Sequence, residues 1–304
     1  INLYNSMNFS EDVNKAICNI SKDQRELLSI YKIGSSVENT PILAINLGIG
    51  SKKILINATH HAREMISTIL LLDQIQYILN LYKKNSSVDN INIRELLHKV
   101  TLVFVPLVNP DGADLVLNGK YFLSNQYKNM FYLQRNSFES WKSNIRGVDL
   151  NRNYPTKHPS NDTVNYPGPK GYTGPWYFSE PETSALKDLT EFCLFEGSIS
   201  YHSSGEEIYW QFNQCKEEKD RDLQIAKKIS EETTYNLLPE EEVNLGNGYK
   251  DWFIENYKKP ALTMEVSPYV GERKVPQKYY PQIFQQNKNV PIIFAKEISN
   301  NSLN

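Results

Sequence analysis

Apolar residues along the chain follow two periods, and each period predicts a different kind of element. Short alternating or continuous apolar runs predict β-strands, whereas apolar positions that recur every three or four residues predict helices. The expected strands cover residues 28–35, 41–48, 52–59, 101–108, 197–202 and 261–266. The expected helices cover residues 10–20, 64–81, 180–192, 216–235 and 276–298, with Ser179 as the cap of the third. The run NPDG at 109–112 predicts a turn, followed by about seventy residues of long surface loops.

Strands that alternate with helices predict an α/β fold, a mixed β-sheet flanked by helices on both faces. No Pro/Gly/Ser-rich linker divides the pattern, so we expect a single domain over residues 1–304. The Asn-rich end at residues 299–304 is expected to fray. In folds of this class, ligands bind at the carboxyl ends of the strands, and we therefore expect the functional residues at these ends.

Composition narrows the class of protein. The 304 residues are 40% hydrophobic and 22% charged, enough apolar material for a sizeable core, which excludes a disordered chain. The longest apolar stretches, 65–72 and 100–108, are too short to span a membrane. The net charge of -2 argues against nucleic acid or an anionic membrane as a partner and favours a small or peptidic substrate. Three scattered cysteines do not make a disulfide framework or a CxxC zinc site.

A histidine and a glutamate stand three residues apart after the third expected strand. In the run THHAREM, His61 and Glu64 can face the same side across the junction between loop and helix. Imidazole nitrogen and carboxylate oxygen are ligands that zinc prefers, at about 2.0 to 2.2 Å. On its own, however, this spacing fits a pair of capping residues at a helix N-terminus at least as well.

Three further strand ends strengthen the metal hypothesis. His202 ends an apolar strand, where a third ligand would complete a two-His, one-Glu site with an open fourth position. Glu265 is a lone carboxylate in an apolar strand, which is costly unless it is paired or functional. The run GVDLNRNYP supplies Asp149, Asn151 and Arg152, which could orient a histidine and bind a carboxylate. The structural alternatives are a hydrogen-bonded histidine, a salt-bridge partner and an Asn-rich turn.

The order of these motifs resembles the zinc carboxypeptidase family, typified by carboxypeptidase A. The match consists of H-x-R-E, D-x-N-R-N, a strand-end histidine and D-W followed thirteen residues later by Glu, and it spans residues 51 to 268. The resemblance implies that His61, Glu64 and His202 hold one Zn²⁺ per chain. It also implies an enzyme, a metallopeptidase in which Glu265 is the general base that takes a proton from the attacking water.

Further roles are implied by the same resemblance. Asn151 and Arg152 match the pair that binds the terminal carboxylate of the substrate, and Arg63 matches an auxiliary substrate-binding arginine. Asp149 matches a partner of the first zinc-binding histidine. Where the family usually has an arginine that stabilises the oxyanion, the run SWKSNIRGVDLN offers Lys142, a point charge without a two-pronged fork.

Two positions of the substrate pocket depart from the family pattern. The mobile tyrosine that covers the substrate aligns with Val243, so either Tyr249 takes this role through a shifted loop or the role is vacant. At the base of the specificity pocket the chain has Lys250, and a cationic base should favour a carboxylate-bearing side chain after the scissile bond. The alternative is a Lys250 that points to solvent, as most lysines do.

Three longer runs, W-K-x-N-x-R-G-V-D-L-N-R-N, S-Y-H-S-S-G-E-x-I-Y-W and G-Y-K-D-W, resemble one bacterial branch of the family. This branch, the γ-D-glutamyl-L-diamino acid endopeptidases, acts on cell-wall peptides. The resemblance implies hydrolysis of the bond between γ-D-Glu and meso-diaminopimelate or L-Lys in a muropeptide. Three alternatives stay open: a metallocarboxypeptidase that releases acidic C-terminal residues, a non-catalytic wall-peptide-binding protein, and a zinc amidase or deacylase of N-acyl amino acids.

The start of the chain bears on its compartment. It reads INLYNSMNFS, without a signal-peptide pattern and without an initiator Met, so we expect Ile1 to follow a processed or trimmed boundary. Because the implied substrate belongs to the cell wall, we expect an extracytoplasmic or spore-associated location rather than a cytoplasmic one.

Overall fold

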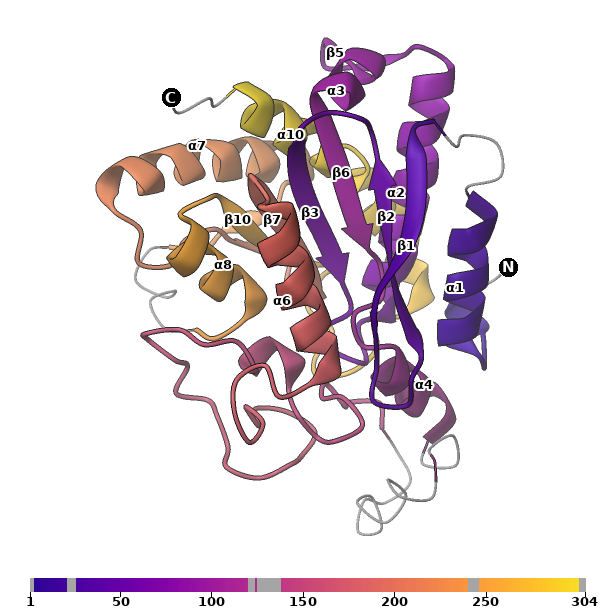
Figure 1. Ribbon diagram of the computed structural model, residues 1–304, viewed down its shortest axis with the longest axis vertical. Coiled ribbons are helices and arrows are strands. Elements are labelled where there is room, and N and C mark those ends of the chain that lie inside the picture. Colours follow the sequence, from indigo (N-terminus) through magenta and orange to yellow (C-terminus); the bar gives the residue numbers. More distant parts are fainter. Residues whose placement is uncertain (1–2, 21–25, 120–123, 125–137, 240–245, 301–304) are drawn as a thin grey trace.

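An eight-stranded sheet runs through the computed structural model, which describes residues 3–20, 26–119, 124, 138–239 and 246–300 (Figure 1). Its strands, in spatial order, are β1 (Leu28–Ser35), β2 (Pro41–Leu47), β6 (Val100–Val105), β3 (Lys52–Ala58), β7 (Gly197–Ser203), β10 (Ala261–Val266), β8 (Glu207–Tyr209) and β9 (Asn236–Leu237). A separate pair joins β4 (Ser87–Val88) to β5 (Ile91–Asn92). The four central strands are parallel, whereas β1, β2 and β8 join antiparallel neighbours, so the predicted mixed sheet is confirmed.

Helices cover both faces of this sheet, as the sequence predicts. The α-helices are α1 (Phe9–Ile20), α2 (Met65–Lys83), α3 (Ile93–Lys99), α4 (Pro110–Asn118), α6 (Pro181–Cys193), α7 (Lys216–Thr233), α8 (Tyr249–Tyr257), α9 (Tyr280–Asn287) and α10 (Val290–Asn300). Short 3₁₀ turns cover Leu3–Asn5, Leu150–Arg152 and Gln277–Tyr279. Figure 1 shows α6 and α8 in front of the sheet.

Strand β6 contributes side chains to two apolar cores, one on each face of the sheet. Leu102 and Phe104 belong to the larger apolar cluster, together with residues of α2, α3 and α10. Val103 and Val105 belong to the second cluster, together with residues of α6 and α8. Side chains alternate between the two faces of a strand, and both faces of β6 are buried. The continuous apolar run of β6 is therefore the pattern of a central strand covered on both sides.

The turn predicted at NPDG is wrong, because these residues begin helix α4. The Asn109 side chain accepts a hydrogen bond from the Gly112 backbone N–H at 3.1 Å, and Pro110 occupies the first turn, where its missing N–H is not needed. A Cβ on Gly112 would lie 2.4 Å from Asn109 Oδ1, so a larger residue at this position would displace the capping amide. The residue types that favour a turn are the same ones that begin a helix.

The helix predicted over residues 276–298 is divided into a 3₁₀ turn, α9 and α10. Pro291 has no N–H to donate to the carbonyl of Asn287, and that carbonyl accepts from Gln74 Nε2 at 2.7 Å instead. Ser299 and Asn300 end α10, while residues 301–304 lie outside the described residues, so the fraying expected over residues 299–304 stays a prediction. The cap expected at Ser179 is wrong, because Glu180 occupies the N-cap and its side chain makes no capping bond.

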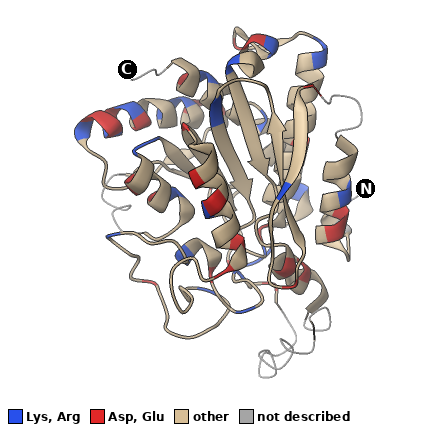
Figure 2. Cartoon of the chain, in the orientation of Figure 1, with Lys and Arg blue, Asp and Glu red and all other residues tan. Residues whose placement is uncertain are grey.

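Charged residues of both signs occur together on helices of the described chain. Figure 2 shows Lys and Arg beside Asp and Glu on α1 and α7, in agreement with a net charge of -2. Among the described residues, no helix is long and apolar enough to cross a membrane. The distinctive charges of the molecule lie instead at the carboxyl ends of its central strands.

Candidate metal centre and active site

Three adjacent parallel strands bring the candidate residues together, as their positions in the sequence predict. His61 and Glu64 lie between the end of β3 and the start of α2. His202 is the last residue but one of β7, and Glu265 is the last but one of β10, directly beside His202 in the strand register. Because β3, β7 and β10 are parallel, these side chains gather at one edge of the sheet.

The three expected ligands form one buried group. Glu64 Oε1 lies 2.8 Å from His61 Nδ1, and Glu64 Oε2 lies 2.9 Å from His202 Nδ1. The two Nδ1 atoms are 3.1 Å apart. Zinc–ligand bonds of about 2.0 to 2.2 Å in a tetrahedral site place ligand atoms about 3.3 to 3.6 Å from one another, a few tenths of an ångström wider than these separations. Across the described residues, this is the one group of three or more potential ligands that could hold a metal ion.

The position of Glu64 decides between the metal and the capping interpretations. Glu64 is the N-cap residue of α2, yet its side chain makes no capping hydrogen bond and points to the two histidines. Burial alone would raise the pKa of Glu64, but the His61 and His202 rings hold it well below its usual range. A buried carboxylate between two ring nitrogens is a donor set that suits a divalent cation, so the residues fit zinc.

Asp149 fixes the orientation of His61. Its Oδ1 lies 3.3 Å from His61 Nε2, which leaves Nδ1 of the ring to face the metal position. Backbone N–H groups of Asn151 and Gly171 donate to the same carboxylate at 3.2 and 2.9 Å. Burial alone would raise the pKa of Asp149, but the His61 ring and the Arg152 guanidinium hold it well below its usual range.

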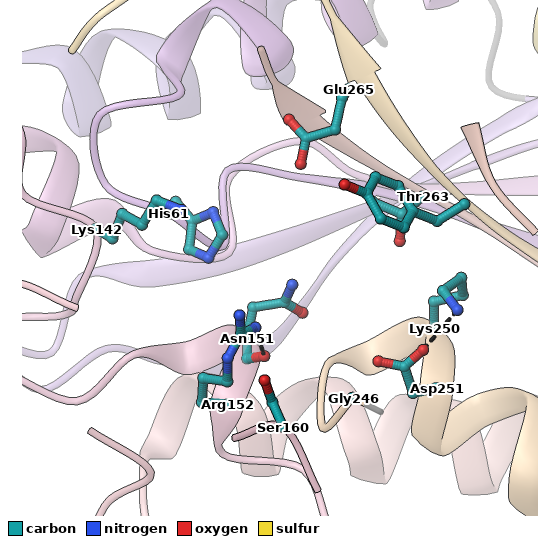
Figure 3. A pocket seen from close by; sticks show the side chains of 11 residues that line it. His61, Lys142, Asn151, Arg152, Ser160, Gly246, Lys250, Asp251, Thr263 and Glu265 are labelled. Carbon is teal, nitrogen blue, oxygen red and sulfur yellow. Dashed lines mark hydrogen bonds and ion pairs between the residues drawn. The ribbon is translucent and has the colours of Figure 1, made fainter. Parts of the chain in front are cut away.

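A polar cavity of about 250 Å³ opens beside this group (Figure 3). Its described lining consists of His61, Lys142, Asn151, Arg152, Ser160, Tyr209, Gly246, Lys250, Asp251, Thr263 and Glu265. Figure 3 shows Lys250 and Asp251 on the opposite side of the cavity from His61 and Lys142. The cavity thus joins the candidate metal position to a separate charged end.

Comparison with known proteins agrees with this geometry. The model of the zinc carboxypeptidase family matches residues 13–288, nearly the whole chain. The chain belongs to the zinc carboxypeptidase family. The zinc cofactor and the metallopeptidase class expected from the sequence are those of this family.

Individual relatives are found among bacterial proteins. Gamma-D-glutamyl-L-diamino acid endopeptidase 1 of Lysinibacillus sphaericus is 33% identical over 84% of this chain, which spans 64% of that protein's length. The protein YqgT of Bacillus subtilis is 29% identical over 89% of this chain and 74% of its own length. In fold, the chain is similar to bovine thrombin-activatable fibrinolysis inhibitor, with a TM-score of 0.77 and 20% identity over 96% of this chain and 97% of that one.

The carboxylate and the lysine expected to act in catalysis, Glu265 and Lys142, both line the cavity of this member of the zinc carboxypeptidase family. Burial and the neighbouring Glu64 carboxylate raise the pKa of Glu265 to about 7. The loop that carries Lys142 is tied to the metal-binding turn, because the Lys142 carbonyl accepts from the Ala62 backbone N–H at 2.9 Å. Glu265 and Lys142 thus approach the metal position from β10 and from this loop.

Arg152 lines the cavity with its guanidinium bound to an acidic neighbour. Nε and Nη2 donate to the two carboxylate oxygens of Asp162 at 3.1 and 2.8 Å. These hydrogen bonds lower the pKa of Asp162 to about 2, so the carboxylate is ionised at neutral pH. Asn151, its neighbour in the cavity, accepts from the Tyr249 backbone N–H through Oδ1 at 3.0 Å. A substrate carboxylate bound by Arg152 must therefore compete with Asp162.

Replacing Asp162 by asparagine is expected to improve the binding of short peptides. With the competing charge removed, KM for a peptide with a free C-terminal carboxylate should fall about fivefold while kcat stays unchanged, because the gain applies equally to ground and transition states. Steady-state kinetics measure both constants. Ser160→Ala is the matched control, since Ser160 lines the same cavity and donates to Asp162 without carrying a charge. A raised KM in Asp162→Asn would contradict competition and assign Asp162 an orienting role.

Lys250 lies in the cavity wall and not at the surface. Its side chain is only 4% exposed, so the alternative in which Lys250 faces solvent is wrong. Nζ donates to the Gln211 carbonyl at 2.8 Å and lies 2.5 Å from Asp251 Oδ1. Arg63 is also buried, with Nη1 donating to the Ser140 carbonyl at 3.1 Å, but it does not line the cavity. The substrate-binding role of Arg63 stays a prediction.

The role expected for Tyr249 is wrong. Its side chain is fully buried, its hydroxyl lies 2.9 Å from Thr190 Oγ1, and its ring packs against Tyr154 and Phe253. A side chain fixed in the core as the first residue of α8 cannot close over a substrate. Val243, the position aligned with the family's mobile tyrosine, lies outside the described residues.

The sequence prediction missed the cavity residues Thr263 and Tyr209, of which only Thr263 can be read from the strand pattern. Thr263 precedes Glu265 by two positions on β10, so both side chains face the same side of the sheet. Tyr209 belongs to β8, a short strand that pairs with β10 and places Tyr209 beside Thr263. In the sequence, Asp251 stands out only as part of the D-W motif. The alternation in ALTMEV was sufficient to find Thr263, whereas Tyr209 required the pairing of the strands.

Proposed function

We propose that this protein is a zinc metallopeptidase that hydrolyses the bond between γ-D-glutamate and a diamino acid in peptidoglycan peptides. The observation that carries the proposal is the presence of two cations besides Lys142, namely Arg152 and Lys250, in one cavity beside the metal group. Meso-diaminopimelate at the end of a peptide has two carboxylates, one on its backbone and one on its side chain. The relative from Lysinibacillus sphaericus, whose name describes this activity, supports the γ-D-glutamyl linkage.

The residues of the cavity suit the steps of such a hydrolysis. Arg152 and Asn151 would bind the terminal carboxylate and thereby position the scissile bond. Glu265 would take a proton from the attacking water and return it to the leaving amine. Lys142 would stabilise the negative charge that develops on the carbonyl oxygen. When held by His61, Glu64 and His202, zinc supplies a Lewis acid that polarises the carbonyl and promotes ionisation of water.

The proposal predicts a defined product from a natural tripeptide. Zinc-loaded protein incubated with L-Ala-γ-D-Glu-meso-diaminopimelate should release free diaminopimelate, identified by mass spectrometry. Glu265→Gln is the control, because it retains the metal ligands and removes the base. Release by the wild type alone supports both the linkage and the role of Glu265. Release of an acidic residue from an α-linked peptide, without cleavage of the γ-linked one, would contradict the proposed linkage.

A metallocarboxypeptidase that releases acidic C-terminal residues is the second candidate. Arg152 and Lys250 would each attract one of the two carboxylates of a C-terminal glutamate, with Asp251 beside Lys250 opposing the second. A wall-peptide-binding protein without activity is less well supported, because the three ligands and Glu265 are all present and adjacent. Activity on γ-linked against α-linked peptides distinguishes the first two candidates, and turnover excludes the third.

A further inference from the structure

The charged end of the cavity contains an ion pair between consecutive residues. Lys250 Nζ lies 2.5 Å from Asp251 Oδ1, and the two side chains are 4% and 13% exposed. Both residues line the cavity, opposite His61 and Lys142 (Figure 3). A ligand that reaches this end therefore meets a cation and an anion in contact with each other.

We propose that Lys250 and Asp251 together recognise a zwitterionic group, the ammonium and carboxylate of an α-amino acid carried at the end of a substrate side chain. This inference rests on the proposed function, and it assigns to Asp251 a part in specificity. The two charges of such a group are attached to one carbon, which matches two protein charges in contact. The side chain of diaminopimelate ends in this group, whereas those of glutamate and lysine carry one charge only.

The backbone holds both charged groups in place. Lys250 and Asp251 belong to the first turn of α8, and Asp251 Oδ2 accepts from the Gly248 backbone N–H at 3.1 Å. Lys250 Nζ donates to the Gln211 carbonyl at 2.8 Å and lies 5.7 Å from the centre of the Phe212 ring. A pair held in this way has little side-chain freedom to lose when a ligand binds.

Each member of the pair keeps hydrogen-bonding capacity for a ligand. An ammonium has three N–H groups, and those of Lys250 serve the Gln211 carbonyl and Asp251. A carboxylate accepts at about four positions, and that of Asp251 serves Lys250 and Gly248. A ligand carboxylate can thus add to Lys250, and a ligand ammonium can add to Asp251, without separation of the pair.

The same arrangement disfavours side chains with one charge. A lone carboxylate attracted by Lys250 would face the Asp251 carboxylate, and a lone ammonium attracted by Asp251 would face Lys250. Like charges brought together in a largely buried site are costly, and this penalty discriminates between ligands as effectively as the attraction does. The zwitterion is the side-chain end that satisfies both residues without such a contact.

Three matched peptides test the inference. L-Ala-γ-D-Glu-X is prepared with X as meso-diaminopimelate, as L-2-aminopimelate, which lacks the side-chain ammonium, and as L-Lys, which lacks the side-chain carboxylate. The wild type should show a kcat/KM for diaminopimelate about 30-fold above that for either analogue. Equal values for diaminopimelate and 2-aminopimelate would overturn the inference, since Asp251 would then contribute nothing.

Two variants assign the preference to individual residues. Asp251→Asn keeps an acceptor for the Gly248 N–H and should remove the preference for diaminopimelate over 2-aminopimelate. Lys250→Met keeps the apolar stem and should remove the preference for diaminopimelate over lysine. Retention of both preferences in the variants would also overturn the inference. If a variant does not fold, as judged by circular dichroism, the wild-type ratios remain a complete test.

A parallel series with α-linked peptides keeps this test separate from the proposed function. If α-linked peptides alone are hydrolysed but the ranking of X holds, the γ-D-glutamyl proposal fails and the inference stands. If γ-linked peptides are hydrolysed without the ranking, the proposed function stands and the inference fails.

Discussion

Replacement of Glu265 by glutamine is expected to lower kcat on the cleaved peptide by about 10³-fold, with the fold and the zinc content unchanged. The amide has nearly the shape of the carboxylate but cannot accept a proton from water at neutral pH. Glu265 is not one of the three converging ligands, so its replacement leaves the His61–Glu64–His202 group intact. Single-turnover kinetics on zinc-loaded protein would measure the loss in the chemical step.

Glu207→Gln is the matched control for this variant. Glu207 pairs with Glu265 in the register of β8 and β10, is partly buried and does not line the cavity. Its replacement removes one carboxylate from the same neighbourhood and is expected to change kcat less than about threefold. A Glu265→Gln enzyme that retained more than a tenth of the wild-type kcat would show that another group accepts the proton.

The sequence predicts the metal group well because each ligand is tied to a strand end. A parallel central sheet brings the carboxyl ends of β3, β7 and β10 to one edge, regardless of the conformation of the loops. His61, Glu64 and His202 could therefore be predicted from periodicity and topology, and the family resemblance added their roles. Glu265 follows from the cost of a lone carboxylate in an apolar strand.

The substrate end of the cavity could be predicted only in part. The family motifs predict that Lys250 lies at the base of the pocket. Its contact with Asp251 depends on the start of α8, a helix that the apolar pattern does not predict. The substrate-covering role predicted for Tyr249 is wrong for the same reason, because the start of α8 directs its ring into the core. The link between Arg152 and Asp162 joins the end of a short 3₁₀ turn to an irregular loop, and hydrophobic periodicity gives no information on such a contact.

Removal of zinc is expected to abolish activity while the fold remains. His202 belongs to β7, and His61 and Glu64 lie at the junction of β3 with α2. Both β3 and β7 lie in the middle of the sheet between two apolar clusters, and these clusters stabilise the strands without the metal. The apoprotein prepared with a chelator should keep its far-ultraviolet circular dichroism, lose peptidase activity and regain it with one equivalent of Zn²⁺. Unfolding of the apoprotein at room temperature would instead assign the metal a structural role.

Replacement of His202 by alanine is expected to weaken zinc binding by about 10³-fold, because one of three protein ligands is lost. His202 Nδ1 lies 2.9 Å from Glu64 Oε2 and 3.1 Å from His61 Nδ1, so removal of the ring takes away one of the three converging ligand atoms. Competition with a chromogenic chelator measures the affinity, and zinc added to apoprotein should raise the Tm of the wild type but not of the variant. His98→Ala, which removes an exposed histidine from α3, is the control and should bind zinc as the wild type does. If His202→Ala bound zinc as tightly as the control, the metal would have to be held without β7, and the assignment of this strand end to the metal centre would fail.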